Sequence, residues 1–137
     1  MKFSCEKALL QSAIGTAGRA VAAKSSIPAL EGILVEATDR GLRLTGYNLE
    51  TGITTLVEAD VAKEGSLVLS ARLFSEIVRK MPDDMVTFVS NGYNVNIKCG
   101  LSEFNILATD PEEFPELPEF SAAEKLRLEK EISGMFL

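Results

Sequence analysis

The sequence predicts an α+β fold in which one β-α-β-β-β unit occurs twice, with two helices on one side of antiparallel sheets. Three observations predict this fold. Apolar residues recur at helical spacing in residues 7–21 and again in residues 71–81, strand-like segments with turn signals follow each stretch, and the order of elements is the same in both halves. Because helices and sheets each bury one apolar face, we expect both helices to press against the sheets from the same side.

The first half, residues 1–61, is predicted to contain one helix and several strands. The helix covers residues 7–21, because its apolar residues recur at intervals of three and four and so share one face. These residues are Leu10, Ile14, Ala17 and Val21. Pro28 favours extended geometry at Ile27, so residues 24–28 are predicted to form a loop. The predicted strands are residues 2–6, 32–37, 42–47 and 53–61.

The second half, residues 66–107, repeats this order. Its helix covers residues 71–81, with Ser70 as the N-cap residue. The inward stripe consists of Phe74, Ile77, Val78 and Met81. Asn91-Gly92 is a strong hairpin signal, and Asp39-Arg40-Gly41 provides the equivalent turn in the first half. The predicted strands are residues 66–70, 85–90, 93–99 and 102–107.

The composition changes after Leu107, since residues 110–119 contain three of the five prolines and five acidic residues. We expect an ordered crossing and linker here, because Phe114 and Leu117 need apolar surroundings. A strand at residues 126–128 and a helix from residue 129 are predicted to follow. We therefore expect residues 1–120 to form one domain and residues 121–137 to be the truncated start of a second.

The composition argues against a membrane protein and against an enzyme. The chain has no apolar run long enough to span a membrane and no apolar signal-peptide core, so we expect a cytoplasmic protein without a membrane partner. Histidine is absent, which removes the most common general base and metal ligand. Cys5 and Cys99 are far apart in sequence and are expected to be small buried hydrophobic residues. We expect no catalytic residues, no metal and no cofactor.

Positive charge is concentrated along the two predicted helices. The chain has a net charge of −6, but residues 7–24 carry +3 and residues 71–80 carry +2. An acidic protein with two basic helices can hold a polyanion against those helices and repel it elsewhere. The outward residues predicted from a helical wheel are Ser12, Gly15 and Arg19 on the first helix, and Arg72, Glu76 and Arg79 on the second.

Several segments resemble one known family. They are Met1-Lys2-Phe3, residues 24–30 (Lys-Ser-Ser-Ile-Pro-Ala-Leu), residues 44–50 (Leu-Thr-Gly-Tyr-Asn-Leu-Glu) and residues 114–117 (Phe-Pro-Glu-Leu). Over residues 1–120 the sequence resembles the amino-terminal domain of the bacterial DNA polymerase III beta subunit, the sliding clamp. The resemblance implies the DNA clamp fold: a ring of two head-to-tail subunits, each with three similar domains, whose helices line a hole for duplex DNA. Such a processivity factor tethers the replicative polymerase to double-stranded DNA.

The resemblance also suggests site residues. Lys24 occupies a loop position where the family usually has a basic residue near DNA, and Arg72 matches the basic residue at the start of the second helix. From the wheel and charge arguments we add Arg19, Arg79, Lys80 and Lys7. These side chains would face phosphates, so contacts should be few, independent of sequence and sensitive to salt. For each of the added residues, a solvated surface base is an equally good interpretation.

The resemblance further implies a subunit interface. In the family, the strand at residues 102–107 pairs with the third domain of the partner subunit, and Phe104 and Ile106 would supply apolar packing there. Glu103 lies where some members have a basic residue. On position alone, Phe104 and Ile106 would be ordinary core residues. The cleft that receives the polymerase catalytic subunit and the clamp loader lies between the second and third domains, which this sequence lacks.

Two alternatives remain open on the sequence. One is a protein–protein interaction domain that does not contact DNA, in which the basic helices only offset acidic strands. The other is a metal-dependent hydrolase that uses clustered acids, either Asp110, Glu112 and Glu113 or Asp83 and Asp84. Those acids lie at predicted turns beside prolines, where solvated charge is the ordinary outcome.

Overall fold

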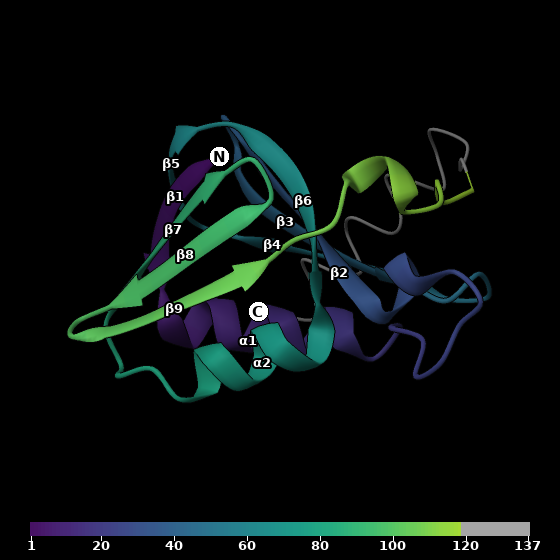
Figure 1. Cartoon of the computed structure of the whole chain (residues 1–137), viewed down its shortest axis with the longest axis horizontal. Helices are drawn as coiled ribbons and strands as arrows, with labels where there is room; N and C mark the ends of the chain where they lie inside the picture. The colour runs from purple at the N-terminus through teal and green to yellow at the C-terminus, as the bar shows by residue number, and fades with distance from the viewer. Residues whose placement is uncertain (119–137) are drawn as a thin grey trace.

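The computed structural model describes residues 1–118 of the chain, and Figure 1 shows their arrangement. The predicted strand at residues 126–128, the helix from residue 129 and the domain boundary after residue 120 lie outside the described residues.

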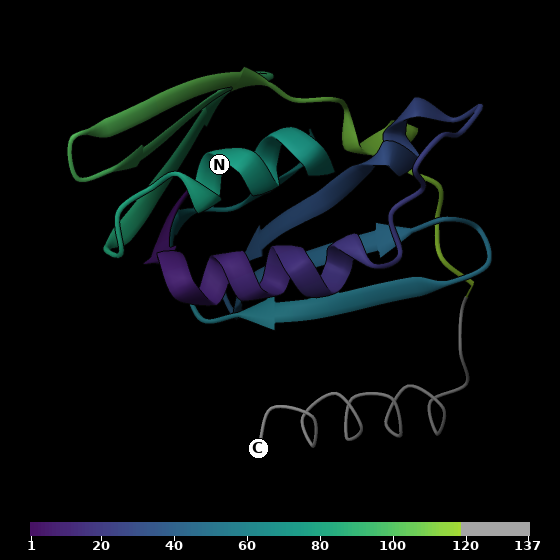
Figure 2. The same ribbon diagram turned by 90° about the horizontal axis from the view of Figure 1, so that it is seen from below.

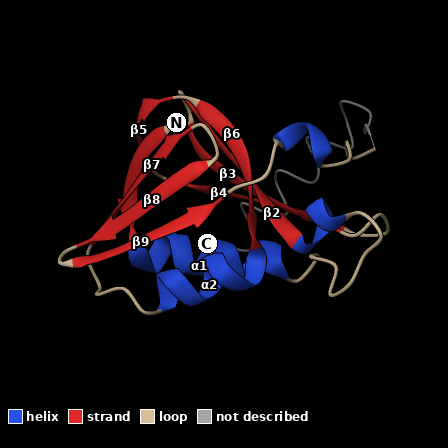
Figure 3. Cartoon of the chain, viewed as in Figure 1, coloured by secondary structure: helices blue, strands red, loops and turns tan. Residues whose placement is uncertain are grey.

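Two antiparallel sheets and two α-helices make up this part of the chain (Figure 3), which confirms the α+β prediction. The helices are α1, Lys7–Gly18, and α2, Ala71–Arg79. The five-stranded sheet has the order β5-β1-β7-β8-β9 and consists of β1 Lys2–Glu6, β5 Asp60–Lys63, β7 Met85–Asn91, β8 Asn94–Cys99 and β9 Ser102–Leu107. The four-stranded sheet has the order β4-β3-β2-β6 and consists of β2 Gly32–Thr38, β3 Gly41–Tyr47, β4 Gly52–Val57 and β6 Gly65–Ser70. Two short 3₁₀ helices are η1, Pro28–Glu31, and η2, Pro111–Glu113.

The two halves are related by an exchange of strands. The first strand of each half pairs with the three-stranded meander of the other half: β1 pairs with β7, and β6 pairs with β2. If β1–β4 take the labels β6–β9 and the reverse, the strand order β4-β3-β2-β6 becomes β9-β8-β7-β1. This is the order of four neighbouring strands in the five-stranded sheet. The registers also agree, since Glu6 lies opposite Met85 and Ser70 lies opposite Gly32. The repeated β-α-β-β-β unit is confirmed.

The prediction of one strand over residues 53–61 is wrong. The chain forms β4 in the four-stranded sheet, leaves it at Glu58 and Ala59, and then forms β5 at the edge of the five-stranded sheet, beside β1. Side chains alternate between the two faces of β4, because Thr55 and Val57 are buried while Leu56 is 74% exposed. Alternation continues through the break, so the sequence pattern could not reveal a change of sheet.

Both helices lie on the same side of the sheets, as predicted, and Figure 2 shows them side by side. They run antiparallel, since the Lys7 ammonium at the start of α1 donates to the Arg79 carbonyl at the end of α2 at 3.5 Å. At the start of α2, the amide of Leu73 donates to the Ser70 hydroxyl at 3.3 Å, which confirms Ser70 as the N-cap residue.

Both helices end earlier than predicted: α1 stops at Gly18 rather than at residue 21, and α2 stops at Arg79 rather than at residue 81. After Gly18 the amides of Arg19, Ala20 and Val21 each donate to a carbonyl three residues earlier, so the chain tightens into 3₁₀-like turns. A side chain at Gly46 would overlap the carbonyl oxygen of Ala17, so the end of α1 rests directly on the backbone of β3.

The first hairpin turn of the second half lies one residue later than the Asn91-Gly92 signal suggested. Asn91 pairs with Asn94, so Gly92 and Tyr93 are the central turn residues, and Gly92 has a φ of 62°. The next hairpin is built in the same way, with Gly100 at a φ of 60°. Glycine at the first central position adopts this left-handed conformation without strain.

The main core lies between the helices and the two sheets. Both predicted helix stripes are buried in it, except for Val21, which is half-buried and packs against it. Phe88 of β7 links the layers, since its ring stacks on Phe3 with centroids 4.6 Å apart and meets Phe74 of α2 edge-on at 6.4 Å. Within residues 1–118, no helix is long and apolar enough to cross a membrane.

Candidate nucleic-acid interface

The antiparallel arrangement divides the six predicted basic residues between the two ends of the helix pair. At one end the start of α1 meets the end of α2, which brings Lys7 close to the segment of Arg79 and Lys80. At the other end the chain leaving α1 meets the start of α2. The basic residues at this second end are Arg19, Lys24 and Arg72.

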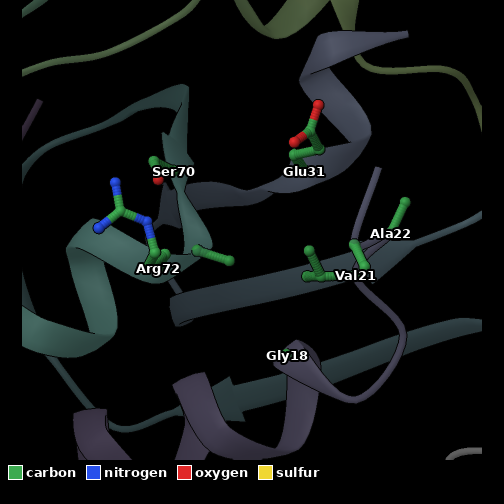
Figure 4. A pocket seen from close by; sticks show the side chains of 8 residues that line it. Gly18, Val21, Ala22, Glu31, Ser70 and Arg72 are labelled. Atoms are coloured by element: carbon green, nitrogen blue, oxygen red, sulfur yellow. The ribbon is translucent and has the colours of Figure 1, made fainter. Parts of the chain in front are cut away.

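The second end encloses an open pocket of about 500 Å³. Figure 4 shows Arg72 of α2 and Glu31 of η1 among the side chains around it. The lining residues are Gly18, Val21, Ala22, Ala23, Glu31, Ser70, Ala71 and Arg72. Lys24 follows directly after the lining residue Ala23 and is exposed. Three cations (Arg19, Lys24 and Arg72) and one carboxylate therefore belong to the segments that surround this opening.

Most of the basic side chains are free to meet a partner. The Arg72 side chain is 74% exposed and pairs only loosely with Glu76, at 3.6 Å, one turn further along α2. Such an exposed pair contributes about 0.3–0.5 kcal/mol, so a phosphate can replace the carboxylate at little cost. Arg19, Lys24, Arg79 and Lys80 are exposed, whereas Lys7 is half-buried.

The outward face of α1 has little bulk. Ala8, Ser12 and Gly15 are exposed, and a side chain added at Gly15 would meet nothing within 4 Å. Leu9, at 44% exposure, is an apolar exception that the helical wheel did not single out. Small and polar residues flanked by cations allow the backbone of a large polyanion to approach without inserting side chains among its bases.

The acidic clusters proposed for a metal hydrolase are used in local structure. Asp110 accepts hydrogen bonds from the amide of Glu112 at 2.9 Å and from the Tyr93 hydroxyl at 3.0 Å. Asp84 accepts one from the amide of Met85 at 2.7 Å. In the described part of the chain, no group of three or more His, Cys, Asp or Glu residues is arranged to hold a metal ion. The hydrolase alternative gains no support.

The two cysteines are buried free thiols, as expected, and Cys99 donates to the Pro82 carbonyl at 3.2 Å. Burial, with a smaller contribution from Glu6, raises the pKa of the Cys5 thiol to about 12. Burial also raises the pKa of Cys99. Both side chains therefore stay protonated near neutral pH, where a protonated thiol is a poor nucleophile.

The predicted interface strand β9 lies at the edge of the five-stranded sheet, where it pairs only with β8 among the described strands. Phe104 and Ile106 are half-buried and pack against the main core, so they are core residues that keep an exposed edge. Glu103 is on the outer face and meets the Lys98 ammonium at 3.7 Å and the Asn96 amide at 2.7 Å.

Comparison with known proteins identifies the family. The model of the DNA polymerase III beta subunit, N-terminal domain, matches residues 1–118. The chain belongs to this family. Among curated relatives, the beta sliding clamp of Bacillus subtilis is 37% identical over 128 residues, and that of Streptomyces coelicolor is 32% identical over 123 residues. These alignments cover 87% and 90% of this chain, but only 34% and 33% of the relatives.

Solved sliding clamps have the same fold. A putative DNA polymerase III beta subunit from Eubacterium rectale superimposes with a TM-score of 0.86 at 32% identity, covering 88% of this chain and 33% of that one. The sliding clamp of Bacillus subtilis superimposes with a TM-score of 0.84 at 34% identity, covering 89% of this chain and 34% of that one. The chain thus spans about one third of the length of these bacterial clamps. The prediction of a clamp fold is confirmed.

Sliding clamps are accessory, non-catalytic subunits of a replicative polymerase, which confirms the prediction that the chain is not an enzyme. The structure adds three residues, Glu31, Leu107 and Leu101, to the candidate site residues predicted from the sequence. Glu31 lines the pocket beside Arg72, and the position of this acid directly after the Lys24–Leu30 segment could have indicated it. Leu107 is 75% exposed at the end of β9, and Leu101 is fully exposed in the turn before it. Strict alternation along β9 places Leu107 on the outer face, a signal that the sequence already contained.

Proposed function

We propose that the chain contributes to the DNA-facing wall of a sliding clamp, a processivity factor that encircles duplex DNA and tethers the replicative polymerase. One observation carries the proposal: on a chain with a net charge of −6, exposed basic residues lie at both ends of an antiparallel helix pair, and the outward face of α1 between them carries mostly small and polar residues. Membership of the beta subunit family supports it.

The mechanism relies on weak electrostatic contact. Lys24 and Arg72, at one end of the helix pair, are the main phosphate contacts, and Arg19 reinforces them from the same end. Lys7, Arg79 and Lys80 act at the other end. Lysine at position 24 lacks the planar fork of arginine, but a passing phosphate needs only charge. Because none of these contacts involves base edges, the protein can move along DNA of any sequence.

The ring itself is also part of the proposal. Residues 1–120 form the first clamp domain, and residues 121–137 begin the second. The free edge of β9 pairs head to tail with a second copy of the full-length protein, with Phe104 and Ile106 supplying apolar contact and Glu103 on the rim. The polymerase catalytic subunit and the clamp loader bind elsewhere in the full-length protein.

Titration of the isotopically labelled chain with a short DNA duplex, followed by amide NMR shifts, tests the DNA-facing surface. At about 20 mM salt, where screening extends over roughly 20 Å, we expect shifts at Lys24, Arg72 and their neighbours. The double variant Lys24→Glu, Arg72→Glu should reduce the apparent affinity by more than about tenfold, because it replaces two phosphate contacts with repulsion.

The matched control is the double variant Arg40→Glu, Lys63→Glu, which makes the same number of charge reversals at exposed positions outside the helix pair. We expect it to leave the DNA-induced shifts almost unchanged. If both proteins lose affinity equally, the effect is one of net charge and not of the helix pair. If neither loses affinity, the DNA-facing assignment fails and the chain is better described as a protein-binding domain.

A further inference from the structure

The loop that carries Lys24 packs against a small second core, separate from the main one. This second core contains five buried residues and several half-buried ones. Its buried members are Ala29, Leu30, Tyr47, Val68 and Phe114, and its half-buried members are Ala22, Ile27, Leu34 and Leu117. The apolar residues of the loop therefore meet the segment that follows β9 over the surface of the four-stranded sheet.

The loop has little backbone support of its own. The amide of Ala22 donates to the carbonyl of Leu30 at 3.0 Å and closes the loop at its base. Inside the loop, the amide of Ile27 donates to the Ser25 hydroxyl at 3.1 Å. Lys24 itself is exposed and follows two residues after Ala22. Its position depends on how firmly Ala22 and Leu30 are held at the base.

The crossing segment, residues 108–118, is by contrast well anchored, and its path after β9 can be followed in Figure 1. Thr109 and Val68 exchange backbone hydrogen bonds of 2.8 and 3.0 Å, and the amide of Ala108 donates to the Tyr93 carbonyl at 2.7 Å. The Tyr93 hydroxyl then donates to Asp110 at 3.0 Å, and Asp110 in turn caps η2. These bonds place Phe114 in the second core, where it is only 6% exposed.

Leu117 extends the same contact. A side chain added at Gly52 would come within 2.5 Å of Leu117, so Leu117 lies directly over the start of β4. Tyr47, a buried member of the second core, is the last residue of β3 opposite Gly52. The aromatic ring of Phe114 and the side chain of Leu117 thus cover one side of the cluster to which Leu30 and Ala29 belong.

We infer that Phe114 is a positioning residue for Lys24: it fixes the base of the loop, so the crossing segment sets where the loop cation lies. This inference rests on the proposed function, because Lys24 matters to DNA only if the helix pair faces DNA. It extends that function by making the crossing segment, which bears no basic residue, a determinant of phosphate contact. A change in the path of this segment would displace the cation without any change of charge.

The structural part is tested by amide hydrogen exchange of the 137-residue chain. Phe114→Ala opens a cavity beneath the loop, so we expect the amides of Ala22 and Leu30 to exchange more than about tenfold faster. Phe114→Leu refills most of that volume and should restore most of the protection. Leu117→Ala, at a half-buried position, provides a milder variant should Phe114→Ala fold poorly.

The matched control is Ile97→Ala, which removes a fully buried side chain from the main core in β8. At a similar loss of melting temperature it should accelerate exchange in the five-stranded sheet more than in the loop. If Ile97→Ala and Phe114→Ala accelerate the loop equally, or if Phe114→Ala leaves loop exchange unchanged, the positioning role is overturned.

The DNA titration separates this inference from the proposed function. With Phe114→Ala we expect the DNA-induced shift at Lys24 to weaken several-fold, although no charge has changed, and with Phe114→Leu we expect it to recover. A loosened loop with an unaltered response to DNA would overturn the positioning role. If even the unmodified chain shows no response to DNA, the proposed function fails, while the exchange data still decide whether Phe114 holds the loop.

Discussion

At the scale of single residues, Leu49 has the most unusual backbone. It has a φ of 76° and is 55% exposed, and within residues 1–118 it is the one residue other than glycine with a positive φ. The Asn48 side chain holds the turn, since its oxygen accepts from the amides of Glu50 at 3.0 Å and Thr51 at 2.7 Å. The Cβ atom of a residue other than glycine lies too close to the following carbonyl oxygen in this region, which stores about 1–2 kcal/mol of strain.

We predict that Leu49→Gly raises the free energy of unfolding by roughly 0.5–1 kcal/mol, because glycine adopts a positive φ without strain and this gain exceeds the entropy lost by the more flexible unfolded chain. Urea denaturation of the chain measures it. The control is Leu56→Gly, at an exposed extended position of β4, where the same substitution should lower stability. Destabilisation by both variants would contradict the strain argument.

Tyr93 links a hairpin turn to the crossing segment and titrates abnormally. Its hydrogen bond to Asp110, followed by burial and by the negative charges of Asp110, Glu112 and Glu113, raises the pKa of Tyr93 above its ordinary value of about 10. The folded state therefore retains a proton that the unfolded state loses first. The stability that this group contributes is present below pH about 10 and is lost as the pH rises through the folded pKa.

We predict that the ultraviolet absorbance of the phenolate, taken as the difference between the chain and its Tyr93→Phe variant, has its midpoint above pH about 10. Asp110→Asn removes the charged acceptor and should lower that midpoint, whereas Asp83→Asn, at an exposed acid in another turn, should not. A midpoint at or below the ordinary value would show that the bond to Asp110 is not maintained in solution.

Local chemistry explains why several residues could be predicted from the sequence. Ser70 precedes a helical stripe, and its cap depends only on the next three residues. Phe114 and Leu117 are apolar residues in an acidic, proline-rich segment. Their packing could be inferred because exposing apolar side chains to water costs free energy. The strain at Leu49 could not, because nothing in the residue type favours a positive φ.

At the scale of elements, β9 is an edge strand with one half-buried apolar face and one exposed face. Phe104 packs against the core through part of its surface, and the remainder lies at the edge where a partner strand would add. An unpaired edge strand has free backbone donors and acceptors that favour pairing with another chain. The element thus contributes both to the fold of the chain and to the proposed assembly.

We predict that Phe104→Ala in the full-length protein weakens dimerisation by about tenfold or more, because truncated anchors at an interface cost at least about 1–2 kcal/mol. Sedimentation velocity over a range of concentrations measures it. Phe104→Leu keeps most of the core contact and separates loss of folding from loss of assembly. Val89→Ala, on the outer face of the central strand β7, is the matched control. An unaltered dimer would refute the interface role of Phe104.

Elements also show where sequence patterns lose information. The single strand predicted over residues 53–61 is β4 and β5 in different sheets. Apolar and polar residues alternate with the same period in either sheet, so the pattern shows which side chains are buried but not which strand is the neighbour. The early end of α1 has a similar cause, because contact of Ala17 with Gly46 on β3 lies outside the reach of helical periodicity.

At the scale of the whole molecule, charge is separated between the helix pair and the rest of the surface. Because few cations face the proposed DNA path, binding by the chain should be weak and should fall steeply with salt. The same separation should make binding independent of base sequence, since phosphates are alike in every duplex.

We predict that the logarithm of the association constant falls linearly with the logarithm of salt concentration, with a slope between roughly −1 and −3, as expected when about one to three of the proposed cations contact phosphate at a time. Titrations with two duplexes of unrelated sequence at several salt concentrations measure it and provide the control for base recognition. A tight complex that is insensitive to salt, or a large difference between the duplexes, would contradict the phosphate-contact mechanism.

The sequence by itself determined what depends on near neighbours: the helices and most strands, their buried faces, the cap at Ser70 and the separation of charge along the chain. Only the tertiary structure decided which segments meet. The first strand of each half pairs with the other half, α1 runs antiparallel to α2, and the Lys24 loop lies close to Arg72. Phe114 of the crossing segment belongs to the same apolar cluster as Ala29 and Leu30 at the end of that loop. The reason is physical. Periodicity and capping are local properties of the chain, whereas strand partners and shared cores are selected by hydrogen bonding and burial between residues far apart in sequence.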